Sequence, residues 1–418
     1  KVPVQEDMTE FNEYLVWVED LKPHTISVIN ELTGYSKVLR PVEVSTESLE
    51  NSEILLKVNK DGTINIKNRS KGLEFNNIHI FEDRADVGDT YNFEPLKNDI
   101  PVKATLLDSK IVESGGLRGK IRLHYAMDLP ACINDDVLSR SNTTLKHNIY
   151  VDISLSAQSE MVEFEAEWEN QSKDHTLQLK FKLPEKVTST ISEDSFGLIE
   201  RSFDPDYSLR NTMPAGKAKE LKYNTAPMQR FVWSQGLGII TEGLSEYGVD
   251  DNELYITLLR SVGILSKGVM NVRGQAAGPP LLTPGAQCIG PQKAKYALVL
   301  THNPEELFKT ADIFMGCILS QTATGNETKH YDINLYSLDN TNIYTYAVKK
   351  PVISNDKKVV ARLMNISDKE QEVSIQSSFE ISEIYEANSL EEVQSNNLLG
   401  KKILFKPYEL KSIIINYS

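Results

Sequence analysis

Apolar and polar residues alternate along many short segments of this chain, with the period of two that places successive side chains on opposite faces of a β-strand. The clearest examples are Ile54–Val58, Thr63–Lys67, His147–Leu155 and Val162–Trp168. Between the first two, the segment Asn59–Gly62 ends in Asp-Gly, which readily adopts the positive φ of a tight hairpin turn. The pattern therefore predicts antiparallel strands joined by hairpins.

Helical periodicity is scarce by comparison. The best candidate is Pro304–Ala311, where Asn303 can cap the amino end and Pro304 suits the first helical position. Strand-like runs return towards the carboxyl end, at Val359–Met364 and Ile413–Tyr417. We therefore expect an all-β protein.

Turn signals and composition divide the chain into three units. For residues 1–48 the pattern predicts a short β segment that is too small to be a domain. We expect it to supply the closing strands of an upstream β segment. Residues 49–318 contain many long strands, whose spacing favours a large antiparallel sandwich. After a polar stretch at 321–329, residues 330–418 predict a small C-terminal β-sandwich.

Composition narrows the classes of function. With 418 residues, 40% of them hydrophobic and 25% charged, the chain is long enough for two or three hydrophobic cores. Its formal net charge of −14 argues against nucleic-acid binding, which requires a basic face, and no apolar run reaches the roughly 18 residues of a membrane-spanning helix. Three scattered cysteines, Cys132, Cys288 and Cys317, favour a reducing compartment, and the expected location is cytoplasmic.

The segment Phe81–Pro95 has the most distinctive chemistry. It places several acids, a turn glycine and alternating aromatic residues between the strand-like runs Ile78–Ile80 and Val102–Leu106. Carboxylates accept hydrogen bonds from hydroxyl groups, and Tyr91 offers both a ring face and a phenol to a polyol. The segment predicts a sugar-binding loop, with a solvated acidic hairpin as the alternative.

Within this segment, Asp86 to Phe93 resembles the Asp-x-Gly-Asp-x-Tyr-x-Phe signature in the C-terminal half of family 38 glycoside hydrolases. This is the α-mannosidase family, which includes bacterial mannosylglycerate hydrolase-like enzymes. Further blocks resemble the family in the family's own order, namely Met228–Val232, Gly236–Ile239, Leu258–Gly263, Ala277–Pro279 and Pro284–Gly290. Each block is weak alone, but their common order over most of the chain makes the match specific.

The resemblance implies a galactose-mutarotase-like supersandwich over residues 49–318. Family 38 enzymes carry their chemistry in an N-terminal α/β barrel, where a zinc ion held by His and Asp ligands binds sugar hydroxyls and an Asp acts as nucleophile. The chain opens with Lys1, and no segment shows the repeated strand–helix alternation of a barrel. The resemblance therefore implies a C-terminal, non-catalytic portion of a retaining α-mannosidase-type enzyme that is inactive alone.

In the parent enzyme, the implied partners are an α-mannoside-type carbohydrate and the catalytic barrel with its zinc. An exposed face that such a barrel would cover leaves the isolated chain prone to self-association as a homo-oligomer. The residues alone predict no metal in this chain, because no two of its seven histidines lie in an i, i+2 or i, i+4 pair.

The resemblance also suggests roles for four residues, our predicted substrate-binding set of Tyr91, Asp86, Asp89 and Arg260. Tyr91 matches the family tyrosine that reaches from the β domain into the active site and positions the sugar. Arg260 matches an arginine that borders the sugar pocket, and we expect it to pair with Asp86 and Asp89 rather than contact the sugar, since a bidentate pair would fix the loop. The alternative for Tyr91 is an edge aromatic stacked on a neighbouring strand, and Arg273 is expected to shape a turn.

Two catalytic alternatives stay open. A self-contained hydrolase needs two carboxylates across the scissile bond, and spacing selects no pair among the loop acids, which include Asp83 and Glu246. An aldose mutarotase-like enzyme would use a His and a Glu as acid and base, and His124, His147 and His175 lie in or beside predicted strands. A lone strand histidine is more often structural, and fold analogy is not evidence of function.

A third alternative is a stand-alone carbohydrate-binding module. Such a module would present exposed Trp or Tyr platforms to the sugar. Trp17, Trp168 and Trp233 instead lie in apolar, strand-like contexts and are predicted to belong to the core.

Overall fold

The computed structural model describes residues 4–6, 14–16, 25–26, 40–204, 220–221, 223–316, 333–352 and 357–418. In this part of the chain strands dominate, and α1 (Glu306–Phe314) is the one α-helix. Neighbouring strands of the large sheets pair antiparallel. The predicted all-β fold is confirmed.

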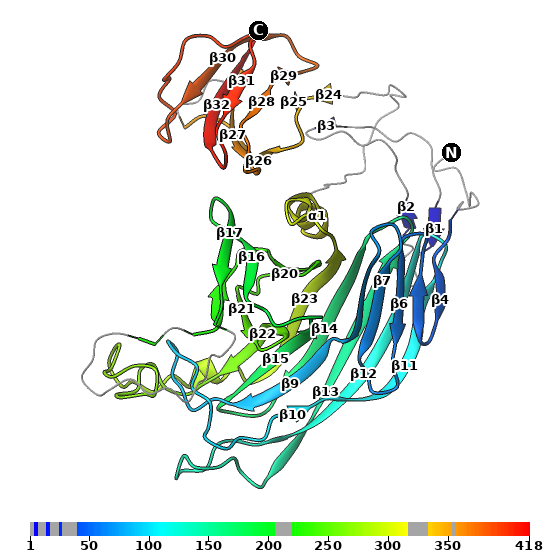
Figure 1. Ribbon diagram of the computed structural model, residues 1–418, viewed down its shortest axis with the longest axis vertical. Coiled ribbons are helices and arrows are strands. Elements are labelled where there is room, and N and C mark those ends of the chain that lie inside the picture. The colour runs from blue at the N-terminus through cyan, green and yellow to red at the C-terminus, as the bar shows by residue number, and fades with distance from the viewer. Residues whose placement is uncertain are drawn as a thin grey trace.

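Three sheets form the larger unit (Figure 1). The first has five strands in the order β4 (Glu43–Ser45), β5 (Ser48–Glu50), β6 (Ile54–Val58), β7 (Ile64–Asn68) and β8 (Leu73–Ile78). The second has six in the order β10 (Val102–Lys103), β9 (Ile80–Ala85), β15 (His175–Lys182), β22 (Glu253–Ser261), β21 (Glu246–Asp250) and β18 (Thr225–Pro227). The third has nine in the order β11 (Thr105–Ser114), β12 (Arg118–Pro130), β13 (Thr144–Ser156), β14 (Met161–Asn170), β23 (Gly290–Leu300), β20 (Leu237–Glu242), β19 (Phe231–Ser234), β16 (Ser189–Asp194) and β17 (Gly197–Ser202).

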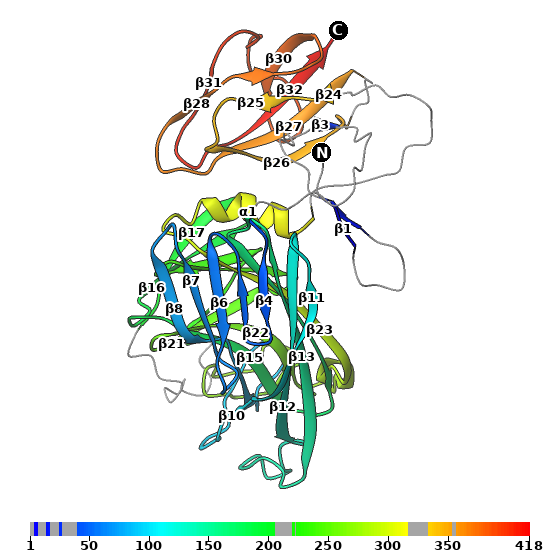
Figure 2. The same cartoon turned by 90° about the vertical axis from the view of Figure 1, so that its right-hand side faces the viewer.

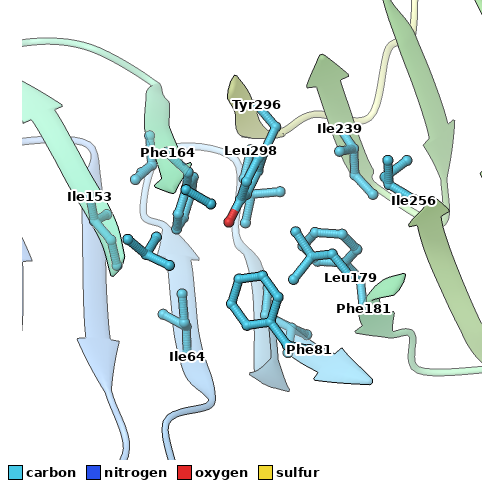
Figure 3. Close-up of a cluster of buried hydrophobic side chains, with 14 of the residues drawn as sticks. Ile64, Phe81, Ile153, Phe164, Leu179, Phe181, Ile239, Ile256, Tyr296 and Leu298 are labelled. Carbon is cyan, nitrogen blue, oxygen red and sulfur yellow. The ribbon is translucent and has the colours of Figure 1, made fainter. Parts of the chain in front are cut away.

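One hydrophobic core joins these three sheets. Figure 3 shows Ile64 of the five-stranded sheet, Phe81 and Phe181 of the six-stranded sheet, and Phe164 and Tyr296 of the nine-stranded sheet packed together. Long strands supply it by alternation, so that every second residue of β12 is buried while the residues between them face outward. The large unit is therefore a sandwich with a single core.

A second cluster covers part of the outer face of the nine-stranded sheet. Leu307, Phe308 and Phe314 of α1 pack there against residues of β14, β19, β20 and β23 and against Met364 of the C-terminal unit. Figure 2 shows α1 lying between the C-terminal strands and the rest of the molecule. The helix thus joins the two units through apolar contacts.

The C-terminal unit has its own core. Its main sheet has the order β26 (Ile343–Lys349), β27 (Lys358–Asn365), β32 (Leu410–Tyr417) and β30 (Ile381–Ala387). Two short pairs complete it, namely β25 (Ser337–Leu338) with β29 (Ile375–Gln376) and β28 (Gln371–Val373) with β31 (Ile403–Phe405). Leu363, Phe405 and Ile413 are buried between these layers. The predicted small β-sandwich is confirmed.

The remaining strands are short. β1 (Val4–Glu6) pairs with β2 (Tyr14–Val16), and β3 (Thr25–Ile26) pairs with β24 (Ile333–Asn334) at the start of the C-terminal unit. β4 belongs with the sheet that follows residue 48. The domain boundaries stay predictions, and the polar stretch 321–329, Cys317 and Trp17 lie outside the described residues.

Several predicted elements appear where the pattern placed them. β6 has the predicted bounds, and Gly62 has the positive φ of 88° that its turn requires. The predicted helix is confirmed but begins at Glu306, so its N-cap is Glu305 and the predicted cap at Asn303 is wrong. The Asn303 side chain instead accepts a hydrogen bond from the Glu305 amide (3.1 Å) in the turn before the helix. The predicted strand Ile78–Ile80 is wrong, because His79 has a φ of 70° and separates β8 from β9.

Candidate functional site

Residues 86–101 connect β9 to β10, and their first half forms a closed loop. An antiparallel bridge joins Asp86 to Pro95 across its base. A Cβ on Gly88 would lie 2.0 Å from the carbonyl oxygen of Asn92, a separation that real structures do not tolerate. The loop can therefore close only with glycine at position 88.

The Asp86 carboxylate is buried at the base of this loop. Oδ1 accepts hydrogen bonds from the amides of Gly88 (2.8 Å) and Glu94 (3.1 Å), and Oδ2 accepts from Arg260 Nε (2.9 Å) and Nη2 (2.7 Å). Burial raises the pKa of Asp86, and the Arg260 guanidinium and the Glu94 amide oppose the rise. The predicted Arg260–Asp86 pair is confirmed, although both donors share one oxygen instead of forming a bidentate fork.

The Asp89 carboxylate holds the loop tip and is also fully buried. Oδ1 accepts from the amides of Tyr91 (3.0 Å) and Asn92 (2.9 Å), and Oδ2 accepts from the amide of Lys267 (2.8 Å) and from Arg273 Nη2 (2.5 Å). Burial would raise the pKa of Asp89, but the hydrogen bonds from Lys267, Arg273 and Asn92 together hold it below its ordinary value. The carboxylate thus links the loop to the 267–273 segment.

The expectation that Arg260 pairs with both acids is therefore wrong for Asp89. Arg260 reaches only the Asp89 carbonyl oxygen (2.9 Å), and the carboxylate pairs with Arg273, which we had expected only to shape a turn. Arg273 also donates to Asn92 Oδ1 and to the Gln275 carbonyl oxygen (2.8 Å). It lies 184 residues from Asp89 in the chain, so no local pattern signalled the pair.

Both carboxylates are saturated by the protein. A carboxylate offers about four acceptor positions, and Asp86 and Asp89 each accept four hydrogen bonds. A sugar hydroxyl could bind either one only by displacing a bond that holds the loop. Their direct contact with substrate stays a prediction, and the geometry assigns both acids a structural task.

Tyr91 differs from these residues because its side chain is 53% exposed. Its ring lies against Arg273, with Cζ 5.9 Å from the ring centroid, and a Cβ on Gly278 would be 3.3 Å from its hydroxyl oxygen. Its amide is fixed by Asp89. Within the described residues, the hydroxyl has no hydrogen-bond partner, so it can donate to or accept from a ligand.

Glu94 is a loop acid that the sequence did not single out. Its Oε1 accepts from the Asn271 amide (3.1 Å), and Oε2 has no partner among the described residues. Burial raises the pKa of Glu94, opposed by that amide and by the nearby Lys267. It is therefore the acid between Asp86 and Pro95 that retains spare acceptor capacity.

Asp83 does not belong to the loop, contrary to our expectation. It lies in β9, fully buried, where one oxygen accepts from Arg140 and the other faces His175 Nδ1 (2.5 Å). His175 Nε2 faces Asn170 Oδ1 (2.9 Å). Asp83 and His175 therefore form a satisfied buried cluster and offer no free acid or base.

The other histidines of the mutarotase alternative also have partners. His147 Nδ1 faces the Leu145 carbonyl oxygen (3.0 Å), and Nε2 accepts from the Gln171 amide (3.1 Å), while burial lowers its pKa. His124 Nε2 faces Asn148 Oδ1 (2.9 Å). Of the three histidines, His124 does share a hollow with a glutamate, Glu167, and its ring is held there by Asn148.

The described residues contain no group of three or more His, Cys, Asp or Glu side chains placed to hold a metal ion. The described helix α1, with nine residues, is too short to cross a membrane.

Comparison with known proteins agrees with this architecture. Residues 49–263 match the glycosyl hydrolases family 38 C-terminal domain, and residues 342–413 match the glycosyl hydrolases family 38 C-terminal beta sandwich domain. The chain belongs to glycosyl hydrolase family 38. The first match includes the Tyr91 loop and Arg260 but ends before Arg273.

Relatives of this family-38 chain are longer than it is. A protein of Halalkalibacterium halodurans, provisionally named mannosylglycerate hydrolase, is 22% identical over 398 residues, covering 88% of this chain and 41% of the relative. Two solved structures from Enterococcus faecalis, a family 38 glycosyl hydrolase and an alpha-mannosidase, share the fold with TM-scores of 0.79 and 0.78 at 20% and 21% identity. This chain is covered completely in both, and it spans 50% and 49% of their lengths.

Proposed function

We propose that this chain is the C-terminal, non-catalytic portion of a retaining α-mannosidase-type glycoside hydrolase, and that Tyr91 completes the sugar site of a zinc-bearing catalytic barrel. The observation that carries the proposal is the contrast within one loop. The Tyr91 hydroxyl is exposed and unpaired among the described residues, while the Asp86 and Asp89 carboxylates beneath it are buried and saturated.

This contrast suits a positioning role. A phenol that is already held in place loses little entropy when it binds a sugar hydroxyl, so its hydrogen bond contributes more to orientation. Arg260 and Arg273 hold the two acids, and Asp89 holds the Tyr91 amide. We propose that these four charged residues prearrange Tyr91 and that Tyr91 itself contacts the α-mannoside.

The surface near this loop supports docking of a catalytic barrel. Val269, Leu281 and Leu282 are exposed large apolar side chains. Their segment is joined to the loop, because Thr90 donates to the carbonyl oxygens of Ile264 and Leu265, and the Leu265 amide donates to Leu281. Exposed apolar side chains favour interaction with another surface, and in the isolated chain they would favour a homo-oligomer. With Cys132 and Cys288 both free, we also propose a cytoplasmic location.

The test compares hydrolysis of an aryl α-mannoside by this chain alone and by a protein extended through the catalytic barrel, with and without added zinc. We expect zinc-dependent hydrolysis only from the longer protein, and a Tyr91→Phe change there to lower kcat/KM about tenfold, the loss of one oriented hydrogen bond. Tyr408→Phe, at another half-exposed tyrosine, serves as the control. Hydrolysis by this chain alone, or an unaffected Tyr91→Phe enzyme, would contradict the proposal.

A further inference from the structure

The nine-stranded sheet has an outer face that α1 covers only in part. The covered part contains apolar residues of β14, β19, β20 and β23. Elsewhere on β12–β14 and the first residues of β23, cross-strand register aligns His124, Tyr150, Glu167 and Lys293 in one row. This row lies on inner strands of the sheet, away from its edges.

Two adjoining hollows lie along this row. The larger, about 540 Å³, is lined by Asn148, Tyr150, Glu167, Trp168, Glu169, Gln171, Pro291, Gln292 and Lys293. The smaller, about 270 Å³, is lined by Asp108, Lys110, Arg122, His124, Tyr150 and Glu167. Tyr150 and Glu167 belong to both, so the tyrosine stands between the two hollows. The larger volume is within the roughly 300–1,000 Å³ of small-molecule sites.

Tyr150 is held as an aromatic platform. Its ring stacks on His124 with centroids 4.6 Å apart and planes at 18°, and His124 is fixed in turn by Asn148. The Tyr150 side chain nevertheless stays 41% exposed. Its hydroxyl has no partner in the part of the chain that the structure describes, which leaves a ring face and a phenol available to a ligand.

Some polar groups around the larger hollow are paired, since Asn148 holds His124 and Lys293 forms ion pairs with Glu165 and Glu167, but others are not. Arg122 and Asp152 form a two-bond ion pair (2.5 and 2.7 Å) in the adjacent row. Three side-chain groups that line the larger hollow can still form hydrogen bonds. Within the described residues, the side-chain amide of Gln171, the carboxylate of Glu169 and Oε1 of Gln292 make no hydrogen bond or ion pair. Donors and acceptors thus converge on the space beside the tyrosine.

We propose that this hollow is a second carbohydrate-binding site, separate from the Tyr91 loop, which takes a neutral pyranoside stacked on Tyr150. A sugar presents hydroxyls that both donate and accept, which matches the mixture of amide, carboxylate and phenol groups. Glu167 and Glu169 disfavour an anion, and Lys293, which pairs with Glu165 and lies 3.5 Å from Glu167, offsets part of their charge. Addition of a peptide strand is excluded, because the hollow lies on inner strands with paired backbones.

The test is calorimetric titration of α-mannotriose into the 418-residue chain. We expect saturable binding that Tyr150→Ala weakens at least tenfold, the scale of one aromatic stacking contact, and that Tyr150→Phe retains within about threefold. Tyr91→Ala should leave this binding unchanged, so failure here is distinguishable from failure of the proposed function. Tyr408→Ala is the matched control.

Circular dichroism and thermal melts establish that each variant is folded. Should Tyr150→Ala misfold, the double change Asn148→Ala and Gln171→Ala replaces it, with the same expected loss. The inference is overturned by absence of saturable binding, by binding that survives the loss of Tyr150 or of both amides, or by binding that Tyr91→Ala abolishes. A dimer in sedimentation that Tyr150→Ala dissociates would also overturn it, since a second copy would then occupy the hollow.

Discussion

The buried pair between Asp89 and Arg273 makes the sharpest test of how the Tyr91 loop is held. Arg273→Met removes the guanidinium and leaves the fully buried carboxylate without its ion-pair partner, while Asp89→Ala leaves a buried cation and frees the amides of Tyr91, Asn92 and Lys267. Breaking one side of a buried ion pair costs about 3–5 kcal/mol, because the remaining charge is uncompensated. Each single variant should lose stability on that scale.

The double variant should lose much less than the sum of the two. Neither charge is then stranded, so we expect a coupling free energy of about 3 kcal/mol in the double-mutant cycle. The pKa of Asp89 is held below its ordinary value of 3.8, so its contribution is fully present above that pH and is lost only as the pH falls further. Urea unfolding at pH 7 therefore measures the intact pair.

Amide hydrogen exchange adds a local readout. The amides of Tyr91, Asn92 and Lys267 donate to Asp89, and they should exchange faster in both single variants. The matched control is the half-exposed pair of Lys67 and Glu74, whose coupling should stay below about 1 kcal/mol. A coupling for Asp89 and Arg273 no larger than the control, with unchanged exchange, would refute the reasoning.

Three further changes test other parts of the molecule. Gly88→Ala should disrupt the Tyr91 loop and lower the free energy of unfolding in urea by about 2–4 kcal/mol, because the added Cβ would clash with backbone atoms. Gly268→Ala, where the Cβ would enter open space, should be nearly neutral, and equal effects of the two changes would contradict this reasoning. Burial lowers the pKa of His79 to about 3, so as the pH falls the unfolded state binds the proton first, and the free energy of unfolding should fall by about 2 kcal/mol between pH 7 and pH 5. His79→Gln should abolish that loss, and a variant with the same pH profile as the original protein would contradict the prediction. Arg230 donates to Glu193 (2.7 Å), to Asp312 of α1 and to Tyr344 of the C-terminal sandwich. Arg230→Met should therefore speed amide exchange in α1 at least tenfold while the core of the large sandwich stays protected, and a uniform change in exchange would argue against a local role.

The sequence by itself determined those strands that have one face in the core and the other in water. β6 and β14 alternate cleanly because one face packs on the core and the other meets water, so local pattern and tertiary burial agree. The turn at Gly62 and the turn at Asn303 that precedes α1 also follow from local backbone preferences. The family likewise follows from local blocks in a fixed order.

Only the tertiary structure decided where the charged residues lie. Glu82 and Asp83 looked like a solvated loop, yet they are buried in β9, because Lys180, Arg140 and His175 arrive from distant segments to neutralise them.

The same holds for the site itself. Tyr91 was predicted from the sequence, but its support by Arg273 was not, since 184 residues separate that arginine from Asp89. The hollow beside Tyr150 needs the register of four strands before its residues converge. Alternation along a strand determines which side chains share a face, but only strand pairing and packing determine which of them are in contact.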